Sequence, residues 1–418
     1  MNLLYNTAIS AYRLGVKIVA HRNEKAQKML TGQAETFDII QNHIKSTDKY
    51  IWIHASSLGE FEQGRPLIEM IKRNNPTQKI LLTFFSPSGY EVRKNYSKVD
   101  VICYLPFDLP KNVNRFLDIV KPKIAIFIKY EFWGNYLQGL HERGIPAYII
   151  SAIFRPTQSF FKPYGATFRN MLKCYTTIFV QDEESKQLLS TIGITNVKIM
   201  GDTRFDRVTD ILAGCKPFPT VKEFVKDSFT LIVGSSWQPD EDIYIPYFNS
   251  HPEIKLIIAP HELSPARIKE ITSRITRPVQ LYSTANEETI ANAECLIIDC
   301  YGILSSCYRY AKVAYIGGGF GVGIHNINEA AVYGIPVVFG PNYRKFKEAH
   351  DLIANGGAFT ISSSQEFSSL MDNLTANPTY CATHGTIAGQ YIEKNLGATI
   401  GIYNDIFQLR TSTIQNRV

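Results

Sequence analysis

The densest group of residues that could do chemistry is a glycine run followed by polar side chains, AYIGGGFGVGIHNINEAA at 314–331. Its glycines are Gly317, Gly318, Gly319, Gly321 and Gly323. Glycine lets the backbone approach a phosphate closely. We expect a helix to begin near His325 or Asn326, where free N–H groups and a partial positive charge would face the same anion. The spacing is not the G-x-G-x-x-G of dinucleotide-binding proteins, so it predicts another kind of phosphate site.

Glu329 follows Asn326 by three residues, and this spacing has two interpretations. On the first helical turn its carboxylate would point into a ligand cleft and accept hydrogen bonds from ribose hydroxyls. It would equally serve as the capping partner of Asn326. Spacing alone does not separate a ribose-binding role from a capping role.

A second stretch, HASSLGEFEQGRPLI at 54–68, places Glu60 directly after Gly59, where a strand gives way to a helix. A carboxylate at this edge is placed to take a proton from an acceptor hydroxyl. The alternative is a first-turn acid that complements the helix N-terminus. The residue pattern alone favours this second, structural interpretation.

Other polar residues also follow apolar runs. Glu131 and Trp133 come after the run 124–128, and Arg204 comes after 197–200, where it could face an anionic ligand. Three more candidates at such edges are Ser235, Ser236 and His261. For each of these, pattern alone favours a solvated loop residue. The sequence holds no Walker A, HExxH, GxSxG or zinc pattern, so we predict chemistry that needs neither metal nor cofactor.

The candidate residues are positioned by short apolar runs that are rich in β-branched and aromatic residues. These runs alternate with segments of helical length. In the first half the runs are 50–54, 80–85, 101–105, 124–128, 147–151, 178–181 and 197–200. In the second half they are 229–233, 255–259, 279–282, 295–298, 313–316, 336–339 and 358–361. This alternation predicts an α/β fold with two parallel sheets. Because ligands bind beyond the carboxyl ends of such strands, two domains suit an enzyme that joins two substrates.

The predicted domain boundaries lie where this alternation is interrupted. A segment with glycine and prolines, 212–227, is the predicted linker between an N-terminal domain at 31–211 and a C-terminal domain at 228–395. Residues 396–418 are predicted to form a C-terminal helix. Residues 1–30 are predicted to form an amphipathic, membrane-associating N-terminal helix.

Composition excludes several classes of protein. Of the 418 residues, 45% are hydrophobic and 20% charged, which excludes disordered, collagen-like and coiled-coil chains. The seven cysteines are scattered and never spaced C-x-x-C, so we expect neither a disulfide framework nor a zinc site. The net charge of +6 comes without a dense Lys/Arg tract, and we expect no nucleic-acid partner.

The N-terminal segment has a helical pattern. Its predicted apolar side holds Leu4, Ala8, Tyr12, Val16 and Val19. The opposite side holds Asn6, Ser10, Arg13 and Lys17. The segment is too short in apolar residues to span a bilayer, so it either packs on its own domain or lies in a membrane interface. Residues 1–30 carry five basic residues and one acid, a net +4 of the chain's +6. Since anionic headgroups attract such residues, this location favours the membrane.

Seven motifs in one order resemble the family of 3-deoxy-D-manno-octulosonic acid (Kdo) transferases. They are HASSLGE at 54–60, TFFSPSGYE at 83–91, YLPFDLP at 104–110, YEFWGN at 130–135, GDTRFD at 201–206, IGGGFGVGIHNINEAA at 316–331 and GIPVVFGPNYRKF at 334–346. The resemblance implies the GT-B glycosyltransferase fold, two Rossmann-like domains facing a cleft. It also implies inverting transfer of Kdo from CMP-Kdo to the lipid A precursor (lipid IVA) of lipopolysaccharide, at the cytoplasmic face of the bacterial inner membrane.

The resemblance also implies roles for individual residues. Glu60 is similar to the family's general base, and Glu131 matches an acid of the N-terminal half of the cleft. Glu329, with Asn326 and the glycines Gly317 to Gly319, resembles the CMP site. The helix expected near His325 and the Arg204 cation would stabilise the leaving CMP. Ser235, Ser236 and His261 match donor-side positions.

Several positions depart from the family's usual pattern. In the Glu-x-Glu-x-Trp-Pro-Asn element, Lys129 replaces the first acid and Gly134 the proline. Elsewhere, Ala330 replaces a proline, Arg204 a lysine, and Pro260 an arginine. These changes indicate a divergent branch. Two other functions stay open, namely another GT-B enzyme such as a nucleotide-sugar 2-epimerase, or a non-catalytic nucleotide-binding peripheral membrane protein.

Overall fold

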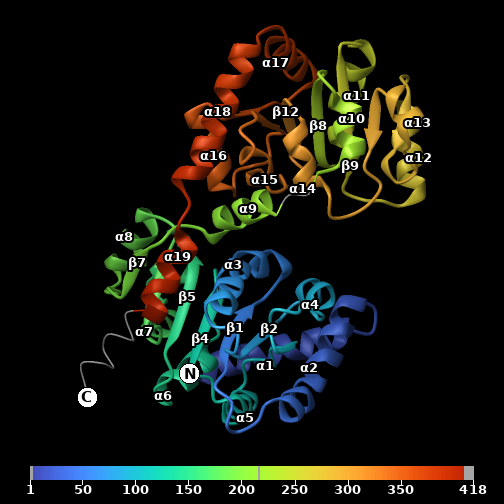
Figure 1. Ribbon diagram of the computed structural model, residues 1–418. Coiled ribbons are helices and arrows are strands. Elements are labelled where there is room, and N and C mark those ends of the chain that lie inside the picture. Colours follow the sequence, from blue (N-terminus) through green and yellow to red (C-terminus); the bar gives the residue numbers. More distant parts are fainter. Residues whose placement is uncertain (1–2, 215–216, 409–418) are drawn as a thin grey trace. The chain divides into compact units, whose positions relative to one another are not determined.

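The computed structural model describes residues 3–214 and 217–408, which fall into two compact units (Figure 1). The first unit runs to Arg207 and takes up the chain again from Leu396, and the second spans Val208–Asn395. Each holds one seven-stranded, fully parallel sheet with helices on both faces. The prediction of an α/β fold with two Rossmann-like parallel-sheet domains is confirmed.

In the first unit the strand order is β3-β2-β1-β4-β5-β6-β7. The strands are β1 (Ile51–Ala55), β2 (Ile80–Phe84), β3 (Val101–Tyr104), β4 (Ile124–Ile128), β5 (Ala147–Ala152), β6 (Thr177–Val180) and β7 (Val197–Ile199). The helices are α1 (Leu3–Val19), α2 (Glu24–His43), α3 (Leu58–Asn74), α4 (Pro87–Arg93), α5 (Pro110–Val120), α6 (Gly134–Glu142), α7 (Ala166–Lys173), α8 (Glu183–Thr191) and α19 (Ala398–Tyr403).

In the second unit the order is β10-β11-β9-β8-β12-β13-β14. The strands are β8 (Phe229–Ser236), β9 (Ile254–Pro260), β10 (Val279–Leu281), β11 (Cys295–Ile297), β12 (Val313–Ile316), β13 (Val337–Phe339) and β14 (Ala358–Thr360). The helices are α10 (Pro219–Val225), α11 (Gln238–Ser250), α12 (Pro265–Arg274), α13 (Glu287–Ala291), α14 (Leu304–Cys307), α15 (Asn328–Ala331), α16 (Lys347–Asn355), α17 (Ser364–Ala376) and α18 (Pro378–Lys394).

The central strands are apolar because helices cover both faces of each sheet. Every residue of β1, β2 and β4 is buried, and their side chains form two cores, one on each side of the sheet. Parallel strands buried on both faces read as continuous apolar runs instead of alternating ones. All the predicted strands are found in the structure, and the central ones show this burial most clearly.

The predicted linker and C-terminal helix contain more structure than the pattern indicated. Helix α9 (Thr203–Ala213) crosses the boundary between the units, and α10 forms within the predicted linker 212–227, of which 215–216 lie outside the described residues. In the predicted helix 396–418, α19 and the turn at Asn404–Gln408 bury Ile402 and Ile406 in the first unit's core. Residues 409–418 lie outside the described residues.

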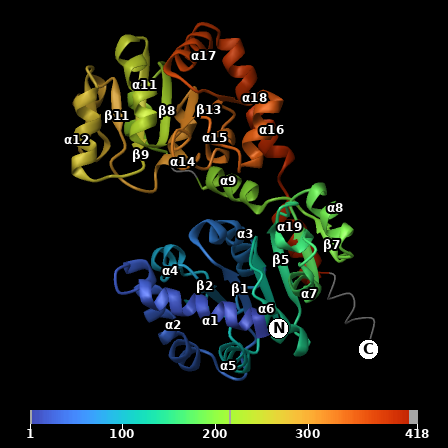
Figure 2. The ribbon, with the colours of Figure 1, turned by 180° about the vertical axis from the view of Figure 1, so that it is seen from behind.

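Helix α1 lies on the outside of the first unit and buries none of its residues completely (Figure 2). The predicted apolar face is wrong in part, because the side in contact with the unit holds Tyr5, Ile9, Tyr12 and Val16, whereas Leu4 and Val19 are exposed. Tyr12 stacks on Phe85, with ring centroids 6.4 Å apart. Among the described residues no helix is long and apolar enough to cross a membrane.

Candidate functional site

The first group of predicted site residues gathers at the carboxyl ends of β1 and β4. Glu60 is in the first turn of α3, where its carboxylate accepts the Ser57 N–H at 2.9 Å and the Ser57 hydroxyl at 3.2 Å. The Glu60 N–H faces the Ser57 hydroxyl at 3.5 Å in return, which completes a capping box. Glu60 therefore does occupy a first-turn, helix-capping position. The capping box fixes the position of its carboxylate.

Glu131 is held from two sides in the loop after β4. Its carboxylate Oε2 lies 2.9 Å from Nε2 of His54, and the Trp133 indole N–H donates to the same oxygen. Tyr175 donates its hydroxyl to the Glu131 backbone carbonyl at 2.5 Å. The carboxylate is almost fully buried, so these donors replace the water that would otherwise solvate it.

This arrangement shifts the pKa of Glu60 toward neutral pH. Burial, followed by the negative charge of Glu131, raises the pKa of Glu60 to about 7, while the bonds from Ser57 oppose the rise. A carboxylate with a pKa near the working pH is what general base catalysis requires. Two carboxylates that repel each other beside a sheet edge are also a recurrent mark of active sites.

His54 is a member of this group that the sequence analysis did not predict. It is the only polar residue of the strand IWIHA and is completely buried. A buried polar side chain in an apolar strand requires a hydrogen-bond partner, and this was the available signal. Its partner, Glu131, lies in the loop after β4, 77 residues further along the chain and beyond the range of local pattern.

The two departures in the loop after β4 have visible structural consequences. Lys129 adopts a left-handed backbone (φ 70°), and its ammonium lies 5.3 Å from the centre of the Tyr130 ring. The Gly134 N–H donates to the hydroxyl of Tyr5 on α1 at 3.1 Å, and a proline there has no N–H to give. Tyr5 in turn donates to the buried Asp108 at 2.6 Å, so this loop is tied to α1.

Arg204 belongs to the first unit, although the sequence analysis grouped it with the donor-binding residues of the second half. Its guanidinium pairs with the buried Asp202, with Nη2 and Nε at 2.7 and 2.8 Å from Oδ2. This cation lowers the pKa of the Asp202 carboxyl even though burial acts in the opposite direction. An anionic ligand that binds Arg204 must therefore compete with the Asp202 carboxylate for the guanidinium.

The second group gathers at the carboxyl ends of β8 and β12. Ser235 has a left-handed backbone (φ 56°), and Gly317 packs directly against it. A Cβ on Gly317 would lie 2.4 Å from the Ser235 carbonyl oxygen, so only glycine fits this crossing. The buried carboxylate of Asp240 joins the two loops, because it accepts the N–H groups of Trp237 and Gly318, each at 2.9 Å.

Three rings line the same edge of the second sheet. Trp237 stacks on His261 with centroids 4.2 Å apart, and His261 lies 4.8 Å from His325. Burial and the neighbouring His261 lower the pKa of His325, which favours a neutral ring. Trp237 was missed by the sequence analysis, although the segment GSSWQPDED carries it directly after two predicted residues. A row of flat rings beside a glycine loop offers a stacking surface for a base or sugar.

The prediction of a helix beginning near His325 or Asn326 is wrong. The helix α15 starts at Asn328 and has four residues, because the Asn326 side chain accepts the Asn328 N–H at 3.2 Å and forms a turn first. The Asn326 amide also donates to the Glu329 carboxylate at 3.0 Å. Asn326 is exposed and Glu329 is half-buried.

Substituting Gly317 should test the crossing of the two loops. The Gly317→Ala Cβ would meet backbone atoms of Ser235 and Ser236 at 2.4–2.6 Å, so we expect a loss of about 1–3 kcal/mol of stability. Gly321→Ala is the matched control, because its Cβ has no neighbour closer than 3.8 Å. Calorimetric unfolding of both variants measures the difference, and equal stabilities would refute the packing argument.

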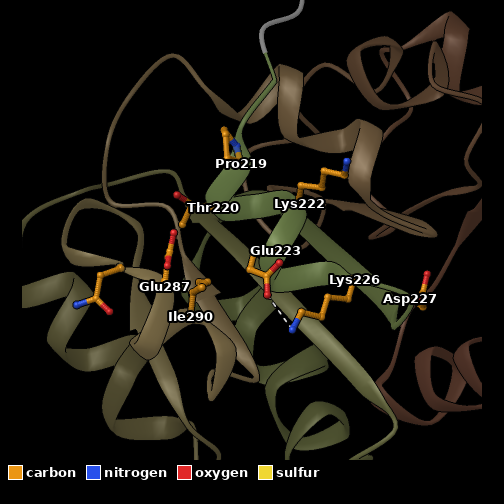
Figure 3. A pocket seen from close by; sticks show the side chains of 9 residues that line it. Pro219, Thr220, Lys222, Glu223, Lys226, Asp227, Glu287 and Ile290 are labelled. Carbon is orange, nitrogen blue, oxygen red and sulfur yellow. Dashed lines mark ion pairs between the residues drawn. The ribbon is translucent and has the colours of Figure 1, made fainter.

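A surface cavity of about 900 Å³ lies between α10 and α13 of the second unit (Figure 3). Its lining is charged, and Lys226 pairs with Glu223 at 2.7 Å. None of the predicted site residues lines it. The candidate site is therefore the two strand-end groups and not this cavity.

Comparison with known proteins identifies relatives for most of the chain. Residues 31–207 match the family model described as 3-Deoxy-D-manno-octulosonic-acid transferase (kdotransferase). The chain is 27% identical to the 3-deoxy-D-manno-octulosonic acid transferase of Aquifex aeolicus over 322 residues, which covers 75% of this chain and 82% of that protein. It is 22% identical to the transferase of the same name from Chlamydophila psittaci, covering 84% and 83%.

Solved structures show the same fold at low sequence identity. A UDP-GlcNAc 2-epimerase from Neisseria meningitidis superposes with a TM-score of 0.62 and 17% identity, covering 86% of this chain and all of that one. MurG from Acinetobacter baumannii superposes with a TM-score of 0.54 and 14% identity, covering 86% and 99%. These likenesses identify the architecture as GT-B.

Proposed function

We propose that this chain is a Kdo transferase of lipopolysaccharide core biosynthesis, like the relatives it resembles, and that it transfers Kdo from CMP-Kdo to a hydroxyl of lipid IVA with inversion. The observation that carries the proposal is Glu60, a partly buried carboxylate with its pKa raised to about 7 at the carboxyl edge of a parallel sheet. A base of this kind is required to activate a glucosamine hydroxyl.

In the proposed reaction Glu60 takes the proton from the acceptor hydroxyl as its oxygen attacks the anomeric carbon of Kdo. The bond from that carbon to the phosphate oxygen breaks, and CMP leaves with the extra negative charge. The fixed negative charge of Glu131 keeps the affinity of Glu60 for that proton high. After the transfer, the proton passes from Glu60 to solvent.

The second unit supplies the proposed donor site. Its glycine run and the turn at Asn326 face the phosphate, while Trp237 and His261 offer stacking surface to the base or sugar. Glu329 receives ribose hydroxyls through its carboxylate. His325, held neutral by burial, contributes hydrogen bonding without adding charge.

The proposed location is the cytoplasmic face of the inner membrane, with α1 lying in the interface. Support comes from the outer side of α1, where Leu3, Leu4, Leu14 and Ile18 are 82, 78, 59 and 66% exposed. Arg13 and Lys17 flank this apolar strip and suit anionic headgroups. A helix with one face packed and a second apolar face in solvent is typical of interfacial helices.

Mass spectrometry of the product formed from CMP-Kdo and lipid IVA tests the reaction. We expect a product heavier than lipid IVA by a whole number of Kdo residues, together with free CMP. A parallel incubation with a UDP-sugar tests the epimerase alternative. Absence of any Kdo adduct from an active preparation would contradict the proposal.

The Glu329→Ala variant tests the proposed ribose contact. Loss of one hydrogen-bonding carboxylate should weaken CMP binding by about 1.5–3 kcal/mol, which is roughly 10- to 100-fold. Glu288→Ala, an exposed acid on α13 of the same unit, is the matched control. Titration calorimetry with CMP measures both, and an unchanged Kd in Glu329→Ala would refute the contact.

A further inference from the structure

A chain of polar contacts runs through the core of the first unit and ends on Glu131. The Trp52 indole N–H donates to the Thr83 hydroxyl at 2.8 Å, and that oxygen lies 2.8 Å from Nδ1 of His54. On the other side of the ring, Nε2 lies 2.9 Å from the Glu131 carboxylate. Trp52, Thr83 and His54 are all completely buried.

Strand register brings these side chains together. Trp52 and His54 are two residues apart on β1 and therefore project to the same face of the sheet. On the neighbouring β2, Thr83 is the register partner of His54. The contact is therefore built into the sheet and does not depend on a mobile loop.

The donors and acceptors determine where the ring hydrogen lies. An indole N–H can only donate, so the Thr83 oxygen accepts from Trp52. Among the partners that the structure describes for Thr83, Nδ1 of His54 is then the one acceptor for the hydroxyl hydrogen. An imidazole that accepts at Nδ1 carries its hydrogen on Nε2, the nitrogen that lies 2.9 Å from the Glu131 carboxylate. If Nδ1 were protonated it would turn to the Thr83 carbonyl, 3.1 Å away, and the buried hydroxyl hydrogen would lose its acceptor.

We infer that Trp52, Thr83 and His54 are positioning residues that hold His54 in its neutral Nε2–H tautomer, so that Glu131 keeps its full negative charge beside the base Glu60. A neutral ring contacts Glu131 without cancelling its charge. An imidazolium in the same place would cancel it. The tautomer stands on the geometry alone, whereas its effect on turnover rests on the proposed function.

Other charged and titratable groups surround this pair. Tyr175 donates to the Glu131 backbone, and Tyr130 lies close enough to interact with Glu60. Around Tyr130 are three further charges: Arg155, Arg204 and Asp202. All of these groups are unchanged in the variants below. A shift in the pH profile of kcat that the variants cause therefore reports on the ring of His54.

Thr83→Val removes the hydroxyl and keeps the shape of the side chain. Without a donor at Nδ1, the ring should take up a second proton and bond to the carbonyl of residue 83. The acidic limb of the kcat profile should then move to lower pH by about 1 unit, because a nearby cation favours the ionised form of Glu60. Thr36→Val is the matched control, a buried threonine of the same unit whose hydroxyl donates to the Tyr104 carbonyl at 2.8 Å.

His54→Gln is the conservative variant. Its amide N–H₂ can donate to Glu131 and its oxygen can accept from Thr83, with no titratable ring. We expect its acidic limb to stay at the wild-type pH whatever its kcat. A purely structural role would lower thermal stability in Thr83→Val and His54→Gln and move neither limb. An unmoved limb in Thr83→Val, or an equal shift in His54→Gln, would overturn the inference.

A readout without substrate separates this inference from the proposed function. In the full chain labelled with ¹⁵N-histidine, the His54 signals are assigned by their loss in His54→Gln. We expect an unprotonated Nδ1 and a protonated Nε2 at pH 7 in the wild-type protein, and protonation of both nitrogens in Thr83→Val. A protonated Nδ1 in the wild-type protein would overturn the inference even if Kdo transfer is observed. The expected tautomer without any transfer would instead count against the proposed function.

Discussion

Glu60→Gln should lose Kdo transfer by about 10²–10⁴-fold, because an amide cannot take the proton of the acceptor hydroxyl. The fold should survive, since Gln serves in a capping box as Glu does and its oxygen can accept the Ser57 N–H. CMP affinity should stay at the wild-type value, because the donor residues lie on the second unit. Initial rates from product mass spectra and calorimetric titration with CMP measure the two quantities.

A matched control for Glu60→Gln is available on the same helix. Glu69 also lies on α3 and pairs with Arg65 at 2.7 Å, so Glu69→Gln removes one helix carboxylate without touching the acid pair. This control should transfer Kdo at close to the wild-type rate. Turnover by Glu60→Gln that matched the control would exclude Glu60 as the base.

The pH dependence has a definite sign. Glu60 acts only in its ionised form, and its pKa is raised to about 7 by burial and by Glu131. The rate should therefore rise as the pH increases through about 7 and fall off below it. In Glu60→Gln the residual rate should lack this inflection. A wild-type rate that is flat from pH 5 to pH 8 would contradict the assignment.

Strands were predictable from this sequence for a simple physical reason. A parallel strand buried on both faces is a continuous apolar run, and such a run is recognised without any knowledge of its neighbours. The glycine at 317 was predictable as well, from its expected approach to a phosphate, which stays a prediction. The structure adds a second need for glycine, because the missing Cβ lets two backbones cross at Ser235.

The features that were missed depend on which segments meet. His54 gains its partners through the register of β1 with β2 and β4, and register is not visible in one strand. The first turn of α15 was misplaced because the Asn326 side chain caps a turn before the helix starts. In α1 the pattern alone could not decide which of two apolar sides packs against the protein, since both contain large residues.

The exposed apolar side of α1 leads to a prediction about membrane binding. The triple variant Leu4→Ser, Leu14→Ser and Ile18→Ser should lose at least about 3 kcal/mol of membrane affinity, if each side chain contributes about 1 kcal/mol at the interface. This corresponds to at least a hundred-fold loss of partitioning into anionic vesicles. Flotation or sedimentation with vesicles of phosphatidylethanolamine and phosphatidylglycerol measures it.

The three side chains are 78, 59 and 66% exposed, so their replacement should leave the fold intact. The helix remains fixed by Tyr5 and by the packing of Tyr12 and Val16, which lie on its other side. A control with three other exposed apolar residues, Val92→Ser, Tyr164→Ser and Tyr301→Ser, removes similar surface away from α1. That control should bind vesicles as the wild-type chain does.

The basic residues of α1 allow an independent test in the same vesicle-binding experiment. Arg13→Gln with Lys17→Gln should weaken binding to anionic vesicles by about 2 kcal/mol and have little effect on neutral ones. Added salt should reduce the wild-type affinity toward that of this variant, because exposed charges are screened. If the apolar triple variant partitions like its control, α1 does not insert. The exposed side of the helix would then have to be covered by something other than lipid.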